Sequence, residues 1–172
     1  MTSVYGEQLE VDARSAERET LEALTDWLTG LRSWNYRATL TFSGDLWVRR
    51  KPVAWLPSDQ AAVRRAEAFC GRVKKATGRT VDVVAGVEHG TKYGRPHVEA
   101  VLCVPEPSEV VERAIEWAWD SRDGNGHMRL RRLKGPPRGA VRYSVKYAAK
   151  DGLVVFSDSL RPVGEALREV YG

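Results

Sequence analysis

The sequence of 172 residues holds few of the residues that build disulfide frameworks or thiolate metal centres, with two cysteines and three histidines. Cys70 and Cys103 form no Cys-x-x-Cys pair, which indicates two reduced, packed thiols in a cytoplasmic protein. No apolar run approaches the ~18 residues that a membrane span needs, and the first residues lack the basic-then-apolar order of a signal peptide. We therefore expect a cytoplasmic protein with no membrane partner.

A phosphate-binding loop of the type Gly-x-x-x-x-Gly-Lys-[Ser/Thr] is also absent, so the chain encodes no NTP-driven motor and no helicase domain. What is present is a chain with 42% hydrophobic residues, long enough for one domain with a core and too short for two. Residues 1–11 are polar and aperiodic, and we expect them to be a loosely ordered lead to a single domain over 12–172. The net charge of +4 permits a polyanionic partner.

Helical and strand periodicities alternate along the chain and predict an α+β fold. Ser58 is placed to cap a helix that stops at Gly78, and two β-rich runs joined by residues 90–95 predict an antiparallel hairpin. Residues 46–57 are basic, aromatic and interrupted by Pro52, which suits an exposed loop or edge piece better than a central strand. The predicted helices cover residues 15–33, 58–78, 109–121, 140–150 and 163–171, and the predicted strands cover 36–42, 80–90, 97–104, 127–133 and 153–157.

The otherwise apolar run at residues 95–104, RPHVEAVLCV, carries two side chains that can bind a metal ion. His97 and Glu99 are two residues apart and share one face of a strand. If the hairpin pairs Glu88 with His97, three ligands converge, and a set of one nitrogen and two carboxylates suits Mg²⁺ or Mn²⁺. A structural pair, with His97 hydrogen-bonded to Glu88, is the alternative, and His89 on the other face is a competing ligand.

Residues 141–152, VRYSVKYAAKDG, contain two overlapping Tyr-x-x-Lys units. On a helix they place Tyr143, Lys146, Tyr147 and Lys150 on the side opposite an apolar stripe that begins at Val141. An ammonium group about one turn from a phenol can lower the pKa of the phenol or neutralise a phosphate. The alternative is a solvated Tyr/Lys face with no chemical role.

Three segments of the chain together resemble the motifs of HUH endonucleases, in particular the class of rolling-circle replication initiators (Rep). These are ATLTF at residues 38–42, GRPHVEAVL at 94–102 with Glu88 ahead of it, and YSVKYAAKDG at 143–152. The resemblance implies a central antiparallel sheet of about five strands with helices packed on it, a ferredoxin-like (RRM-like) arrangement. One departure is that Glu99 stands where the family has the second histidine of its His-hydrophobic-His motif.

The resemblance also implies an activity, which is metal-dependent nicking and joining of single-stranded DNA through a 5′-phosphotyrosine intermediate. Glu88, His97 and Glu99 would hold Mg²⁺ or Mn²⁺, and Tyr147, or as second choice Tyr143, would be the nucleophile. Lys150 and Lys146 would neutralise charge on the phosphate or the phenolate. The expected partners are a replication-origin hairpin of a plasmid or phage and a host helicase and polymerase.

Basic residues elsewhere are weaker candidates for contacts to the DNA backbone. These candidates for DNA binding are Arg49, Arg50, Lys51, Arg129, Arg131, Arg132, Lys134 and Arg138.

Two other functions stay open. One is a non-catalytic domain that binds single-stranded nucleic acid, and the other is a related HUH tyrosine transposase.

Overall fold

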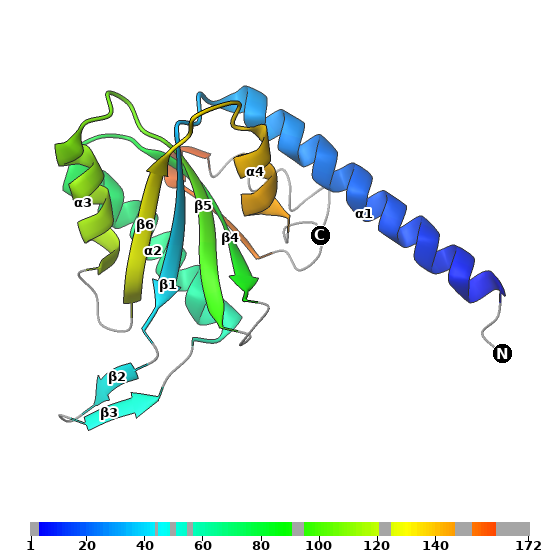
Figure 1. The fold of residues 1–172 in the computed structure, drawn as a ribbon, viewed down its shortest axis with the longest axis horizontal. Coiled ribbons are helices and arrows are strands. Elements are labelled where there is room, and N and C mark those ends of the chain that lie inside the picture. Colours follow the sequence, from blue (N-terminus) through cyan, green and yellow to red (C-terminus); the bar gives the residue numbers. More distant parts are fainter. Residues whose placement is uncertain are drawn as a thin grey trace.

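A five-stranded sheet forms the centre of the computed structural model, with strand order β6-β1-β5-β4-β7 and antiparallel pairing throughout. Figure 1 shows helices on both faces of the sheet, as the predicted α+β class requires. The strands are β1 (Tyr36–Phe42), β4 (Asp82–His89), β5 (Pro96–Cys103), β6 (Asn125–Arg132) and β7 (Val154–Phe156). The structure describes residues 4–43, 45–48, 51–54, 57–90, 95–120, 125–146 and 153–160, and of 4–15, 45–48 and 51–54 it describes the backbone alone.

Two helices cover one whole face of the sheet. They are α2 (Asp59–Thr77) and α3 (Glu109–Asp120), and between them and the sheet lies the larger core, which includes the fully buried Phe69 and Trp119. Ser58 caps α2 through its side-chain oxygen and Gly78 ends it in a left-handed conformation, as the sequence predicts. This face supplies the larger part of the buried apolar core.

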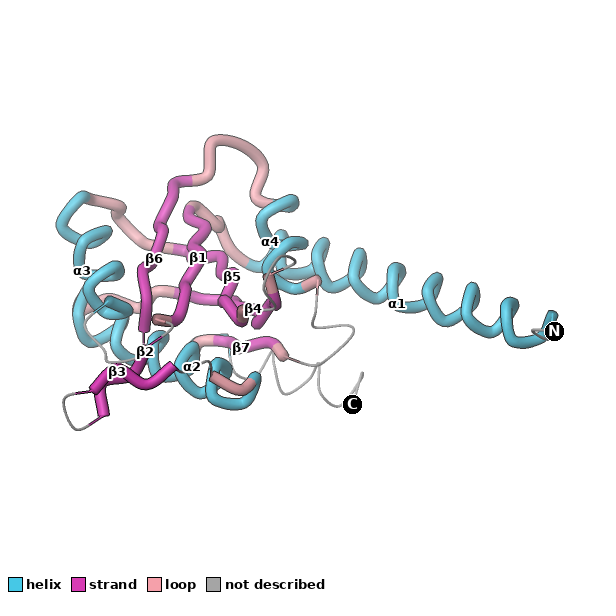
Figure 2. Tube along the Cα trace, turned by 60° about the horizontal axis from the view of Figure 1, so that its bottom comes forward, coloured by secondary structure: helices cyan, strands magenta, loops and turns pink. Residues whose placement is uncertain are grey.

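The opposite face is only half covered. Helices α1 (Val4–Leu31) and α4 (Arg138–Val145) pack over β4 and β5, where Leu28, Val141 and Val145 form a second core with Val84 and Val101. In Figures 1 and 2 the N-terminal part of α1 projects well beyond the sheet. Over β1 and β6 no described helix packs on this face, and alternate side chains of both strands are exposed.

Ion pairs fix α4 to α1. Arg142 donates to Glu22 at 2.8 Å, and Arg138 donates to Glu22 at 2.6 Å and to Asp26 at 2.7 Å. Hydrogen bonds from Arg142 and Arg138 lower the pKa of Glu22 from its ordinary value of 4.5. These contacts hold α4 against α1 both at its first residue and in its last turn.

The structure differs from the sequence-based expectations in three places. Helix α1 begins at Val4, so residues 4–11 are helical where we expected a loosely ordered lead. Of the segment 46–57, residues 46–48 and 51–54 lie outside the central sheet as predicted, but they belong to a separate hairpin of β2 (Asp45–Val48) and β3 (Lys51–Ala54), with Pro52 opposite Trp47. Helix α4 ends at Val145, earlier than predicted, and the expected closing helix at 163–171 lies outside the described residues.

Among the residues that the structure describes, no helix combines the length and the apolarity of a membrane span.

The ion pairs between α1 and α4 predict a pH-dependent stability. Because the folded pKa of Glu22 lies below its unfolded value, its contribution is complete above pH 4.5 and is lost as pH falls through the folded pKa. Glu22→Gln should therefore lower the urea midpoint relative to the wild type at about pH 7, and the difference should shrink at about pH 3. Glu19→Gln, an exposed site on the same helix, is the control and should show no difference at either pH. A Glu22→Gln difference of equal size at both pH values would contradict this role.

Candidate metal centre and nucleic-acid interface

The hairpin of β4 and β5 brings three metal-capable side chains together. Glu88 pairs with His97 across the two strands, which is the register that the sequence analysis considered, and Glu99 follows on the same face. Nε2 of His97 lies 3.4 Å from Oε2 of Glu88 and 3.6 Å from Oε1 of Glu99. One ligand atom from each of the three residues lies within 4.8 Å of the others. We call Glu88, His97 and Glu99 the ligand triad.

The geometry of the ligand triad fits a divalent ion. Adjacent ligands of an ion with bonds of ~2.0–2.2 Å lie roughly 2.8–3.6 Å apart, a range that includes both separations from Nε2 of His97. Nδ1 of His97 lies 3.5 Å from the carbonyl oxygen of Arg95, so that Nε2 is the nitrogen that faces the carboxylates. Two carboxylates held this close repel each other unless a cation lies between them. The three side chains are therefore able to hold a divalent cation.

Contacts around the ligand triad fix its two carboxylates. The hydroxyl group of Thr39, opposite Glu99 on β1, lies 3.0 and 3.1 Å from the two oxygens of Glu99 and donates to that carboxylate. Burial raises the pKa of Glu99, and the hydrogen bond from Thr39 and the nearby His97 partly offset that rise. Such outer contacts orient metal ligands, and their loss typically costs ~10–100-fold in affinity.

Lys146, the residue that follows α4, reaches the ligand triad. Its Nζ donates to Oε1 of Glu88 at 2.7 Å. Burial opposes the charge of Glu88, but the hydrogen bond and charge of Lys146 outweigh burial and lower the pKa of Glu88. Burial likewise opposes the charge of Lys146, yet the hydrogen bond to Glu88 raises its pKa, so both groups are charged at neutral pH. We call residues 141–152 the Tyr/Lys segment. One of its cations is thus in direct contact with a candidate metal ligand.

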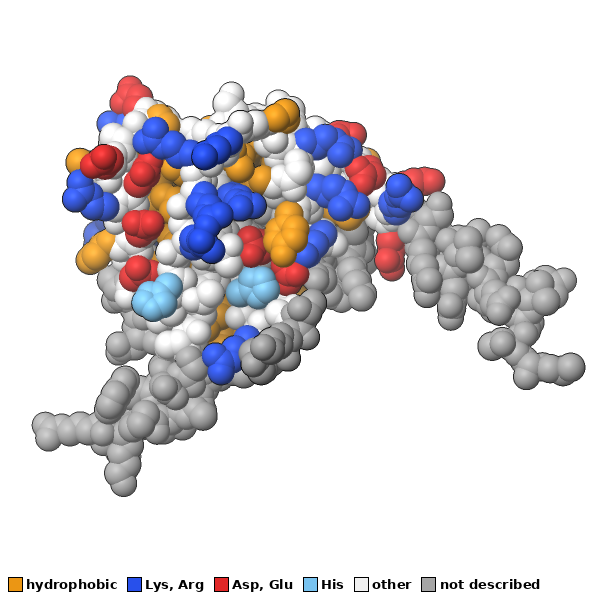
Figure 3. All heavy atoms as spheres, in the orientation of Figure 1, with side chains coloured by type: hydrophobic (Ala, Val, Ile, Leu, Met, Phe, Trp, Pro, Cys, Tyr) orange, Lys and Arg blue, Asp and Glu red, His pale blue; other side chains and the backbone are white. Residues whose placement is uncertain are grey.

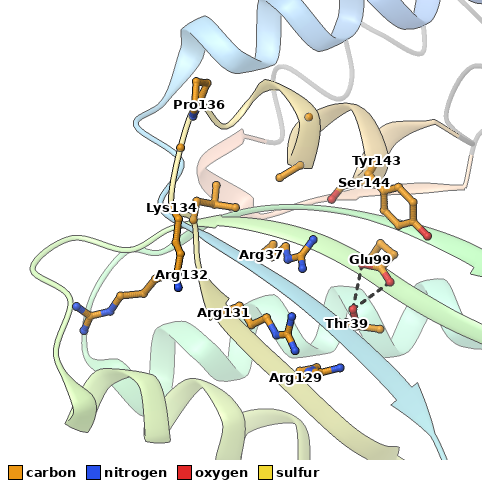
Figure 4. A pocket seen from close by; sticks show the side chains of 14 residues that line it. Arg37, Thr39, Glu99, Arg129, Arg131, Arg132, Lys134, Pro136, Tyr143 and Ser144 are labelled. Atoms are coloured by element: carbon orange, nitrogen blue, oxygen red, sulfur yellow. Dashed lines mark hydrogen bonds between the residues drawn. The ribbon is translucent and has the colours of Figure 1, made fainter.

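Tyr143 lies beside Lys146 and Glu99. It is 46% exposed, on the side of α4 opposite the buried Val141 and Val145 as predicted, and Nζ of Lys146 lies 3.7 Å from the centre of its ring. Figure 4 shows its ring projecting from α4 beside Glu99. The other two residues of the predicted set, Tyr147 and Lys150, lie outside the described residues.

A cavity of about 910 Å³ opens beside Glu99 and Tyr143 on the uncovered half of the sheet. Arg37 from β1 and Arg131 from β6 are directly opposite each other, and Arg129 lies two residues before Arg131 on β6. None of these three guanidinium groups forms an ion pair within the part of the chain that the structure describes. Figures 3 and 4 show cationic side chains gathered over the middle of this face. We call this the arginine cavity.

The predicted DNA-binding residues separate into groups. Arg129, Arg131 and Lys134 line the arginine cavity. Arg132 also lines it but forms an ion pair with Glu112 at 2.6 Å, and Arg138 is held by α1. Arg49 and Arg50 lie outside the described residues, as does the side chain of Lys51. His89, the competing metal ligand, instead contacts Asp59 at the start of α2 at 3.0 Å.

Two contributors to the site, Arg37 and Thr39, were missed from the sequence. Both lie on β1, where Tyr36, Ala38 and Leu40 are buried and the odd-numbered positions face the cavity. The alternation of apolar and polar residues along YRATLTF was the available indication. Placing those polar residues beside Glu99 also required the pairing of β1 with β5, which the sequence did not specify.

Comparisons with known proteins add little. No protein-family model and no curated protein matches the chain. One similar solved structure is the N-terminal nuclease domain of non-structural protein 1 of minute virus of mice, which is described with Zn²⁺ coordination in its active-site pocket and DNA recognition at the origin of replication. It is 15% identical, the match covers 79% of this chain and 71% of that one, and the TM-score is 0.34. That similarity is too weak to support an argument about this chain.

The ligand triad predicts measurable metal binding. Removing the central ligand with His97→Ala should lower the affinity for Mn²⁺ by more than ~100-fold, since loss of outer contacts alone typically costs ~10–100-fold. Titration calorimetry measures this directly. His89→Ala, one residue from Glu88 but on the opposite face, is the matched control and should keep the wild-type affinity. Equal losses in the two variants, or no loss in His97→Ala, would show that the three residues form only a structural ion-pair cluster.

Proposed function

We propose that the protein nicks and rejoins single-stranded DNA by metal-dependent transesterification with a tyrosine nucleophile. The observation that carries this proposal is the direct contact between Lys146 of the Tyr/Lys segment and Glu88 of the ligand triad. A metal site, a phenol and an ammonium group then meet at one end of a cationic cavity. Each of these features alone has a structural explanation, whereas their conjunction is what phosphoryl transfer requires.

The reaction exchanges one phosphate ester for another. A phenol oxygen attacks the phosphorus atom of the scissile phosphodiester, the new oxygen–phosphorus bond forms, and the bond from phosphorus to the 3′ oxygen breaks. The phenol proton passes to solvent and the departing 3′ oxygen takes up a proton, which leaves a 3′-hydroxyl and a 5′-phosphotyrosine. Because one ester replaces another, the step also runs in reverse and rejoins strands.

Each part of the site has a role in this step. Glu88, His97 and Glu99 hold Mg²⁺ or Mn²⁺, and polarisation of the scissile phosphate is the chemistry that a bound ion supplies. Lys146, whose Nζ lies over the ring of Tyr143, would neutralise charge on the phosphate or the phenolate as the reaction proceeds. Lys150 is assigned the same task for Tyr147 by its position in the sequence motif.

The arginine cavity binds the strand that flanks the scissile phosphate. Residues two apart along a strand are separated by ~6.8 Å, so Arg129 and Arg131 can meet successive phosphates of an extended single strand. Lys134 extends the same cationic path away from Glu99. Among the described residues that line the cavity, Tyr143 is the one aromatic side chain, so we expect these residues to recognise phosphates more than stacked bases.

The biological setting stays a prediction from the sequence resemblance. It comprises initiation of rolling-circle replication at an origin hairpin of a plasmid or phage, in the cytoplasm, with a host helicase and polymerase. A tyrosine transposase would use the same chemistry. A non-catalytic binder of single-stranded nucleic acid would use the arginine cavity alone.

The nucleophile can be identified through the covalent intermediate. Wild-type protein incubated with single-stranded origin DNA and Mn²⁺ should give an SDS-stable protein–DNA band, and Tyr147→Phe should abolish it. An adduct that survives in Tyr147→Phe but is lost in Tyr143→Phe would assign the attack to Tyr143 instead. His97→Ala is the control for metal dependence. No adduct with any tested origin library would contradict the proposal and favour the non-catalytic binder.

Phosphate contacts in the arginine cavity can be counted by salt dependence. For a single strand, each neutralised phosphate contributes ~0.7 to the slope of log K against log salt concentration. Arg131→Ala should therefore reduce that slope by about 0.7 and weaken binding uniformly across sequences. Fluorescence anisotropy over a salt series measures both. Arg113→Ala, on the exposed side of α3, is the matched control, and an equal effect there would show that the cavity is not the binding surface.

A further inference from the structure

Gly86 in β4 lies where the backbone of α4 contacts the backbone of the sheet. Gly86 pairs with Glu99 on one side and with Val154 on the other, and its Cβ position would overlap the carbonyl oxygen of Ser144. Ser144 itself is buried near the end of α4. Glycine inside a strand commonly marks such a close approach of another segment of backbone.

The contact lies in the middle of the proposed site. Gly86 is two residues before Glu88 on the same face of β4, and Ser144 stands between Tyr143 and Lys146. The depth at which α4 rests on β4 therefore determines whether Nζ of Lys146 reaches Glu88, which it does at 2.7 Å. It also determines the height of the Tyr143 ring above the ligand triad.

We propose that Gly86 is a positioning residue, whose missing side chain sets the distance between α4 and the ligand triad. A methyl group at this site needs ordinary contact distances from the Ser144 carbonyl, so the end of α4 would have to move outward by about 1 Å, a displacement able to cost ~100-fold in rate. The catalytic consequence rests on the proposed function, whereas the positional role does not.

Other contacts of α4 determine how it can respond to such a clash. Arg138, its first residue, and Arg142, in its last turn, bind Glu22 and Asp26 of α1 through long side chains. Its apolar side is buried against Val84 and Val101. Because these long arginine side chains can follow a shift of this size, a clash at Ser144 moves the backbone of the last turn outward, which carries Tyr143 and Lys146 away from the sheet.

The positional role can be tested without metal or DNA by a double-mutant cycle in urea unfolding. Lys146→Met leaves Glu88 without its ammonium partner and should lower the urea midpoint when residue 86 is glycine. In a chain that already carries Gly86→Ala, where the contact is broken, Lys146→Met should cause little further shift. In the matched background Gly71→Ala, where a Cβ meets nothing within 4 Å, Lys146→Met should have its full effect.

Equal effects of Lys146→Met in the Gly86→Ala and Gly71→Ala backgrounds would overturn the proposal. If Gly86→Ala alone does not fold, the cycle is run in a chain stabilised by Gly30→Ala and Gly71→Ala, two helical sites with open space around a Cβ. Failure to fold in that host would also overturn the proposal, because the glycine would then be a requirement of the core and not of the position of α4.

A second experiment separates this inference from the proposed function. Gly86→Ala should lower the rate of adduct formation at least ~10-fold while its affinity for Mn²⁺ is not reduced, because the ligand triad lies on β4 and β5 and not on α4. Coupling in the unfolding cycle without any adduct from the wild type would support the positional role and refute the nicking function. An unchanged rate of adduct formation in Gly86→Ala would refute the catalytic importance of the position.

Discussion

The antiparallel register of β4 and β5 is the constraint on which the site depends. Side chains alternate between the faces of a strand, so a shift by one residue would move Glu88 to the face covered by α2 and α3 and separate it from His97. The apolar residues that alternate with these ligands hold the register, because Val87 and Val98 are buried in the larger core. A hydrophobic pattern that serves folding thereby also fixes the geometry of a polar site.

The uneven cover of the second face gives the site its shape. Helices α1 and α4 bury the part of the sheet formed by β4 and β5, and the ligand triad lies at the margin of that cover. Glu88 is buried there, and His97 and Glu99 are half-buried. Beyond this margin β1 and β6 expose cationic side chains to solvent. A phosphate chain can therefore lie over β1 and β6 and present one phosphate to a site that is partly shielded from water, where charge interactions are stronger.

The sequence predicted those parts of the structure that depend on local patterns. Strand β1, the caps of α2 and the hairpin of β4 and β5 all follow from periodicity and from single capping or turn residues. What it missed depends on contacts between distant segments. Two cations of the expected DNA-binding set form ion pairs within the chain, Arg138 with α1 and Arg132 with Glu112, and each pair joins different elements. The close approach of α4 to Gly86 was likewise visible only once the helix was placed on the sheet.

The carboxylate of Glu99, where the resembled family has a histidine, is best understood through charge. Relative to a neutral imidazole, it adds one negative charge beside Glu88, and the single ammonium of Lys146 balances only one of the two carboxylates. A bound divalent ion then carries less net positive charge toward an incoming phosphate than it would with two histidines. The guanidinium groups of Arg37, Arg129 and Arg131, which form no ion pair among the described residues, line the same cavity as Glu99 and can supply the missing attraction. Under the proposed function, attraction of the phosphate would thus be shared between the ligand triad and the sheet beside it, and strand binding would be coupled to metal binding.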